Sequence, residues 1–488
     1  MKFKKLIGAI SGVLAALSLA PITAQACTGI IIGKDASVDG STIIGRNEDM
    51  GSAWAKHFVV RPANSNNPDF VSASNGFKIQ LPAEHMEYTA IPEWDVSEGL
   101  FEEGGINSAK VAMSATESAT SNKKVLKIDP LVEDGIDEAA MTTVVLPYIR
   151  SAREGVERLG KIVEEHGSAE TNGVAFADKN EVWYLETLTG HHWVAARVPD
   201  DSYAVVANTL MIQQIDWDDP DNFMYSEGLK EFIEDNKLAK DVKKASMREI
   251  FADTTDDAQY NTPRILSGQN IVTPSEKKDI TGEKFETFMK PDKPITLARA
   301  AFVLRDRFGG TEYDAYLGEK AGELRSASVP RTMESHMLQI RNNVPEEISG
   351  IQWLALGVPD TSSYIPFYAG IKQTPEAYRT GGDKMDMDSA YWVYRMTNYL
   401  TVPYYADLKS QYTLPVRQEV RKHLLSEVER IDKEAEKILK ENPAGLADFL
   451  TEQSGALAKY SLDRYTELNS ELLKEFADRQ AVKHNTDL

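Results

Sequence analysis

The hydrophobic positions near the start of the chain form two short apolar runs. Residues 28–33 (TGIIIG) and 41–45 (STIIG) are separated by a turn-forming cluster, KDASVDG. Apolar runs of this length, bounded by Gly, Asp and Ser, predict two strands of a hairpin. The second run leads directly into the polar tetrad Arg46-Asn47-Glu48-Asp49. Taken alone, such a tetrad is typical of an exposed turn.

Further along, the pattern changes from helical to strand-like. Ser151 and Glu154 form a capping box ahead of Val156, Leu159 and Val163, which share one helical face, and Gly167 follows as a stop signal. We therefore predict a helix between Ser151 and Gly167. Four apolar segments then predict strands connected as a meander, at 173–177, 183–187, 191–197 and 202–207.

The last hundred residues have helical periodicity. After a polar stretch at 371–389, apolar residues recur every three or four positions in two runs separated by Pro443 and Gly445. The runs contain Leu424, Val428, Ile431, Ala435 and Ile438, and then Tyr465, Leu468, Leu472 and Phe476. Two helices of this kind more often pack on their own domain than on a partner helix.

Composition narrows the classes of function. The 488 residues carry a formal net charge of −21, which disfavours binding to nucleic acid because phosphate backbones are repelled. The hydrophobic share of 42% is that of an ordinary globular protein. A single cysteine excludes an intramolecular disulfide framework. No metal-binding, phosphate-binding or dinucleotide-binding motif is present, so we expect no metal and no cofactor.

The first 26 residues predict an export signal. A basic end with Lys2, Lys4 and Lys5 precedes an apolar segment at 6–20, and Ala24-Gln25-Ala26 has the pattern of a signal-peptidase site. The apolar segment is short for a bilayer-spanning helix. We therefore expect an exported protein, secreted or associated with the cell surface, without stable membrane insertion after the signal is removed.

Cleavage after Ala26 would make Cys27 the first residue of the mature chain. Three interpretations compete for this cysteine. It could be a buried structural residue, or a lipidated anchor, although Ala24 and Gln25 differ from the residues usual in lipoprotein signals. It could also be an N-terminal nucleophile whose own α-amino group accepts the thiol proton. In a paired hairpin, Arg46 would lie near Cys27 and favour the thiolate, and a nearby carboxylate would hold the ammonium.

At this point the sequence resembles a known family. The stretch CTGIIIGKDASVDGSTIIGRNED is similar to the start of the dipeptidase A-type cysteine peptidases, which are N-terminal nucleophile (Ntn) hydrolases. Further similar blocks lie at 102–118, 183–208, 331–340 and 366–368. A more distant resemblance links the chain to penicillin V acylases and bile salt hydrolases.

The resemblance implies a set of site residues. Cys27 matches the family nucleophile, and Arg46 and Asp49 match an Arg-x-x-Asp element that borders the thiol and the free amine in the acylases. Asn208 ends a strand as the oxyanion-hole Asn of the acylases does, and Arg264 lies near the place of their second active-site Arg. Residues 114–118 (SATES) occupy the region of a further acylase Asn, so a second oxyanion donor is not identified.

The resemblance also implies the fold. We expect an α+β protein with the Ntn-hydrolase αββα sandwich, in which helices cover two stacked antiparallel sheets, and a C-terminal helical extension. The expected division is a signal peptide at 1–26, a catalytic domain at 27–390 and the helical extension at 391–488.

The expected function is a secreted cysteine-type dipeptidase that hydrolyses dipeptides or short peptides through a thioester. Its partner would be a small peptide substrate, and the number of copies in an assembly is left open. An amidase of the penicillin V acylase or bile salt hydrolase type remains as an alternative. So does a non-catalytic surface lipoprotein anchored at Cys27. Because the α-amine would act as base, we expect none of the eight histidines to be catalytic.

Overall fold

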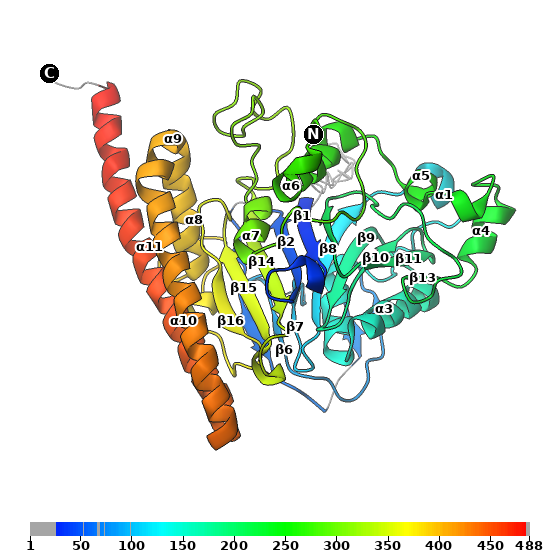
Figure 1. Cartoon of the computed structure of the whole chain (residues 1–488), viewed down its shortest axis with the longest axis horizontal. Coiled ribbons are helices and arrows are strands. Elements are labelled where there is room, and N and C mark those ends of the chain that lie inside the picture. Colours follow the sequence, from blue (N-terminus) through cyan, green and yellow to red (C-terminus); the bar gives the residue numbers. More distant parts are fainter. Residues whose placement is uncertain (1–25, 52, 66–68, 73, 98, 485–488) are drawn as a thin grey trace, which may run out of the picture.

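The computed structural model describes residues 26–484 except 52, 66–68, 73 and 98, and its centre is a pair of stacked antiparallel sheets (Figure 1). The first sheet has the order β12 (Tyr203–Val206), β1 (Ala26–Ile32), β2 (Thr42–Asp49), β14 (Thr332–Ile340), β15 (Gly350–Leu356), β16 (Ile365–Tyr368). The second has the order β13 (Phe223–Tyr225), β11 (Trp193–Val198), β10 (Val182–Thr187), β9 (Thr171–Ala177), β8 (Ala112–Ala119), β7 (Gly104–Ile106). Two small sheets pair β3 (Val59–Arg61) with β6 (Tyr88–Ala90), and β4 (Phe70–Val71) with β5 (Lys78–Ile79).

Helices cover both outer faces of the sandwich. On the second sheet lie α2 (Glu138–Val145) and α3 (Ala152–His166), and on the first lie α6 (Thr262–Val272), α7 (Leu297–Leu304) and α8 (Ala390–Thr401). The short helices are α1 (Lys123–Leu126), α4 (Leu229–Asp235), α5 (Met247–Phe251) and α9 (Tyr405–Leu408). Two long helices, α10 (Leu414–Glu441) and α11 (Leu446–His484), complete the chain.

Successive side chains of β1 and β2 lie on opposite faces of the first sheet. Ile31 and Ile44 face each other on β1 and β2 and belong to the apolar cluster between the two sheets. Their neighbours Ile30 and Ile43 belong to the cluster under α7 and the C-terminal helices. Because successive side chains of a strand point to opposite faces, the hairpin contributes to two cores at once. This explains why both of its strands are apolar at consecutive positions.

The expected fold class is confirmed, and one detail of the connectivity is wrong. The strands β9, β10 and β11 form a meander in the second sheet, but β12 pairs with β1 in the first. The chain crosses between the sheets at Asp200, whose carbonyl oxygen accepts hydrogen bonds from the backbone of Asp35 and Ala36. Tyr203 and Val206 are buried in clusters on opposite faces of β12, so this strand requires cover on both sides.

The helix expected after Ser151 is also present. The Ser151 side chain accepts a hydrogen bond from the Glu154 backbone at 3.1 Å, and Gly167 ends the helix with a φ of 79°. Glu154 reaches back to the backbone N–H of Arg150, at 2.6 Å, rather than to Ser151.

The two C-terminal helices run side by side along the edge of the first sheet (Figure 1). Leu424, Val428 and Ile431 from α10, and Leu468 and Leu472 from α11, are buried in the same cluster as the outer face of that sheet. Their apolar periodicity therefore serves packing on the sandwich, as expected. The boundary placed at 390/391 falls at the start of α8.

The expected export signal lies outside the described residues, apart from Ala26. Within the described ranges, no helix combines the length and the apolarity needed to span a bilayer.

Candidate active site

Cys27 lies near the start of β1, and its side chain is 1% exposed. It is directly opposite Glu48 on β2, and Gly29 is opposite Arg46. Residues opposite each other in a ladder share a face, and so do alternate residues along a strand. Cys27, Arg46 and Glu48 therefore face the second sheet, at the end of the gap that Ile31 and Ile44 fill further along.

Arg46 is the residue in direct contact with the thiol. Its Nη2 lies 3.0 Å from the Cys27 Sγ. The same guanidinium donates from Nη1 to Glu103 at 2.7 Å and lies 3.6 Å from a Glu138 oxygen. The tetrad, which taken alone would be typical of an exposed turn, forms the end of β2, where all four residues are buried. Burial of the Arg is tolerated because carboxylates on other elements surround it.

A second buried cation extends this network. The Lys56 Nζ lies 2.9 Å from Glu48 and 3.0 Å from Glu103, both on carboxylate oxygens. Despite burial, these carboxylates raise the pKa of Lys56 above its usual value. For Glu103, burial acts to raise the pKa, but Lys56 and Arg46 outweigh it and bring that pKa down to about 2. Glu103 is therefore ionised and fixes the orientation of Arg46.

On the β12 side of Cys27, side chains take the place of a neighbouring strand. The Cys27 backbone N–H donates to the Asn208 Oδ1 at 3.0 Å, and its carbonyl oxygen accepts from the Arg264 Nη1 at 2.6 Å. The Arg264 Nη2 also donates to the Asn208 Oδ1, at 2.9 Å. Two donors on this oxygen fix the orientation of the Asn208 amide, because its NH₂ group must point the other way.

Arg264 lies in the first turn of α6, which begins at Thr262 with Pro263 next, and its side chain is buried. Burial lowers the pKa of Arg264 to about 9, and Arg325 adds to this effect. The guanidinium is therefore still charged at neutral pH.

Asp49 lies on the opposite face of β2 from Arg46. Three positions separate the two residues, and an odd spacing on a strand reverses the face. The Asp49 carboxylate pairs with Arg325 and accepts a hydrogen bond from the Thr332 hydroxyl. It is opposite Ala26 in the ladder, one position before Cys27.

The thiol is held in its neutral form. Burial raises the pKa of Cys27 well above its usual value, and Arg46 opposes this effect only in part. Glu138, Asp49 and Glu103 raise it further. Arg46 thus acts in the expected direction, toward the thiolate, but burial and the nearby carboxylates, which the sequence pattern did not reveal, outweigh it. Attack by this thiol consequently requires a base.

A buried hydrogen-bonded chain next to Arg46 was missed. His336 is directly opposite Arg46 in the β2–β14 ladder. Its Nδ1 is 2.9 Å from a Glu334 oxygen, and its Nε2 is 2.9 Å from the Ser114 hydroxyl. All three side chains are 0–1% exposed, so this Ser-His-Glu arrangement is buried. It joins β14 to β8 next to Arg46.

The structure thus places the expected residues near the start of β1 and the end of β2, on both faces of the sheet. Arg46, Asn208 and Arg264 contact Cys27, and Asp49 lies across the sheet with Arg325. Glu103, Glu138 and Lys56 were not predicted. Glu103 lies in a block similar to the peptidase family, which was the only signal in the sequence that pointed to it.

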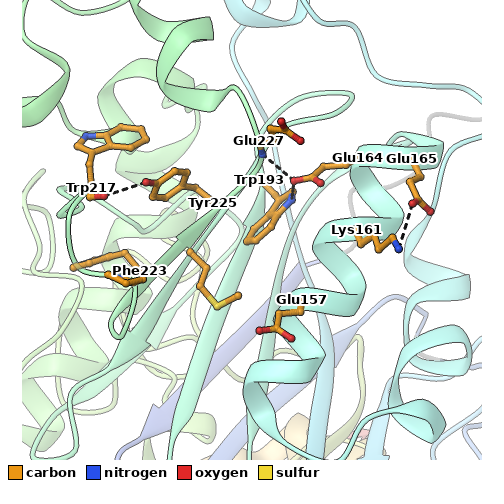
Figure 2. Close-up of a pocket in the computed structure, with 11 residues that line it drawn as sticks. Glu157, Lys161, Glu164, Glu165, Trp193, Trp217, Phe223, Tyr225 and Glu227 are labelled. Carbon is orange, nitrogen blue, oxygen red and sulfur yellow. Dashed lines mark hydrogen bonds and ion pairs between the residues drawn. The ribbon is translucent and has the colours of Figure 1, made fainter.

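Outside the surroundings of Cys27, the described residues form a surface groove but no cluster suited to a metal ion. A surface groove of about 690 Å³ lies between α3 and the edge of the second sheet (Figure 2). Its aromatic residues include Trp193 and Tyr225, and its Glu164 already accepts hydrogen bonds from the Trp193 indole and the Glu227 backbone. The groove shares no lining residue with the Cys27 surroundings. Among the described residues, no group of three or more His, Cys, Asp or Glu is arranged to hold a metal ion.

Comparison with known proteins identifies the family of the chain. The sequence profile of Peptidase family C69 matches residues 26–415. A probable dipeptidase of Latilactobacillus sakei is 41% identical over 93% of this chain and 96% of its own. A probable dipeptidase B of Lactococcus lactis is 37% identical over 91% and 94%, and dipeptidase A of Lactobacillus helveticus is 37% identical over 77% and 81%. The resemblance seen in the sequence is thereby confirmed, and the chain belongs to peptidase family C69.

Proposed function

We propose that this protein is an exported dipeptidase that uses Cys27, exposed as the first residue by removal of residues 1–26, as its nucleophile. The observation that carries the proposal is the contact of the sole cysteine with Arg46, at 3.0 Å, near the start of β1 in a chain of peptidase family C69. Relatives named dipeptidases, with most of their length aligned, support dipeptides as the substrate.

The neutral thiol favours the α-amine of Cys27 as the base. An α-amino group titrates near ~7.7–8.0, so it is partly unprotonated at neutral pH without further tuning. It would occupy the place of the Cys27 backbone N–H, which donates to Asn208 at 3.0 Å. Asp49, held by Arg325 and Thr332 next to this position, would stabilise the ammonium form.

In the proposed reaction the amine takes the thiol proton while Sγ attacks the scissile carbonyl carbon. The Asn208 amide and a backbone N–H would hold the resulting oxyanion. The C–N bond then breaks as the ammonium returns its proton to the leaving amine, which leaves a thioester on Sγ. Water attacks the thioester and gives a proton to the amine. The C–S bond breaks, and the thiolate recovers that proton.

Two variants test the mechanism directly. Protein that starts at Cys27 should hydrolyse dipeptides, and Cys27→Ala should be inactive. A chain with one extra residue before Cys27 should also be inactive, because its amine becomes a non-basic amide. Circular dichroism and thiol titration would verify that the extended chain is folded with its thiol intact. Full turnover by that chain would rule out the free-amine mechanism.

Intact mass and substrate choice separate the alternatives. A lipid-sized mass increase on the Cys27 peptide of exported protein, or a released chain starting at Thr28, would contradict the enzyme proposal. Turnover of penicillin V or a conjugated bile salt equal to that of dipeptides would favour the acylase-type amidase.

A further inference from the structure

A cavity of about 350 Å³ lies between the end of β8 and the start of α2. Glu138, the first residue of α2, lines this cavity and also reaches the nucleophile's surroundings. One of its oxygens lies 3.6 Å from the Arg46 Nη2, which is itself 3.0 Å from the Cys27 Sγ. The other oxygen accepts a hydrogen bond from the Ser118 hydroxyl at 3.2 Å. Glu138 therefore joins the cavity to the thiol.

Carboxylates outnumber cations on this side of the thiol. Glu103 has both Arg46 and Lys56 as partners, whereas Arg46 is the cation that faces both Glu138 and Glu117. The β-bulge between Ala115 and Glu117 interrupts the pairing of β8 with β9. Glu117 reaches β1 at Gly29, where an added Cβ would lie 2.7 Å from its oxygen. Burial raises the pKa of Glu117 to about 7, although Arg46 opposes this.

Two buried polar atoms at the same place have no hydrogen-bond partner among the described residues. They are the Arg46 Nε and the Tyr184 hydroxyl. The Tyr184 ring extends over Gly173, where an added Cβ would lie 1.9 Å from the hydroxyl oxygen. This hydroxyl is within electrostatic range of Glu117, Arg46 and Cys27. Buried polar groups usually have partners, so unsatisfied ones beside a nucleophile mark groups to which a polar ligand could bond.

From this arrangement we infer that Glu138 binds the α-ammonium group of the substrate and that the adjoining cavity receives the side chain of its first residue. The inference rests on the proposed dipeptidase function. In a dipeptide a single carbon separates the ammonium nitrogen from the scissile carbonyl carbon. A carbonyl in reach of Sγ, at ~3–3.5 Å, therefore places the ammonium beside the thiol, where Glu138 lies. Blocking the amine would remove the positive charge that this carboxylate binds in the substrate.

The test is the selectivity of Glu138→Gln for a free against an N-acetylated form of the same dipeptide. The variant should lose about 10- to 100-fold in kcat/KM on the free dipeptide, mainly through KM. Hydrolysis of the acetylated form should stay within about threefold of the parent, so that the preference for a free amine collapses. Glu133→Gln is the matched control, since this exposed carboxylate precedes the same helix. It should leave both rates unchanged.

A parallel measurement distinguishes substrate binding from an effect on the thiol. Because Glu138 raises the pKa of the Cys27 thiol, the pH profile of Cys27 alkylation by iodoacetamide should shift to lower pH in Glu138→Gln, an effect on the thiol that acts equally on both dipeptides. An equal loss on both dipeptides, or an unchanged preference for the free amine, would overturn the inference. If Glu138→Gln does not fold, Ser118→Ala should show a smaller loss confined to the free dipeptide. Absence of dipeptide cleavage by the parent itself would instead contradict the proposed function.

Discussion

The gap between the two sheets has two ends that differ in chemistry although the same strands line both. At one end Ile31 and Ile44 pack against apolar residues of β9, β10 and β11. At the other, Cys27 and Arg46 meet the ionised Glu103. Burial of apolar side chains stabilises the fold, whereas each buried charge costs free energy unless it is paired. The comparison shows that one end of the hairpin contributes apolar packing to the sandwich, while the other gathers paired buried charges around Cys27.

Removing the central cation of the polar end should have the largest effect. Arg46→Met would leave Glu103 and Glu138 with one positive neighbour fewer, and breaking a buried ion pair costs about 3–5 kcal/mol. We expect dipeptide turnover to be lost and the free energy of unfolding in urea to fall by that amount. Arg421→Met, at an exposed position, is the control. A variant as stable as the parent would show that the charges at this end do not depend on one another.

A truncation at the apolar end should affect stability alone. Ile44→Ala removes a fully buried side chain, which costs about 2–5 kcal/mol. Urea unfolding should show this loss, while kcat/KM per folded molecule stays close to that of the parent. A large fall in kcat/KM of the folded variant would mean that the two ends are coupled.

The pH dependence of stability sharpens the comparison further. Burial raises the pKa of Glu186 to about 7, in spite of hydrogen bonds from the Met211 and Ile212 backbone. A carboxyl with a raised pKa contributes stability that is complete below about pH 4.3 and is lost as pH rises to 7. Glu186→Gln stays neutral, so it should lose less stability between pH 5 and 8 than the parent does. The difference should approach about 3 kcal/mol.

Urea unfolding at several pH values would measure this difference. Glu157→Gln, which changes an exposed carboxylate on α3, should keep the pH dependence of the parent. Parallel curves for Glu186→Gln and the parent would show that Glu186 is ionised in the folded protein.

The smallest effect is expected on the outer helices. Lys459 and Asp463 form an ion pair at 2.8 Å on the exposed surface of α11. Exposed pairs of this kind contribute little and are screened by salt. Lys459→Ala should therefore leave the midpoint of urea unfolding and the activity unchanged within error. A clear destabilisation would assign α11 a structural role beyond its apolar face.

The contact between Cys27 and Arg46 could be predicted because both residues lie on one hairpin of consecutive strands. The hairpin brings Arg46 to the face of Cys27, since Arg46 is opposite Gly29 and alternate residues share a face. The apolar spacing of Leu424 and Val428 likewise predicted a packed helix. Asn208 and Arg264 followed from the family resemblance, and the structure brings both into contact with the Cys27 backbone.

The remainder depends on contacts between distant segments. Lys56, Glu103 and Glu138 come from a loop, from the residue before β7 and from the start of α2. No periodicity relates these positions, and charged residues at loop and helix ends are usually solvated. The placement of β12 in the first sheet was missed for a similar reason. A strand of four residues carries no local signal that tells which sheet it joins.

The backbone of Cys27 has a consequence for motion at the end of β1. The ladder with β12 extends only to Gly29, yet the Cys27 N–H and C=O remain bonded to Asn208 and Arg264. Strand ends usually fray where a ladder stops, and frayed amides exchange their hydrogens quickly. Here the side chains secure the strand end where the ladder stops, so its fluctuations should follow those of the whole sheet. Hydrogen exchange at Thr28 and Gly29 should then be as slow as at Ile31.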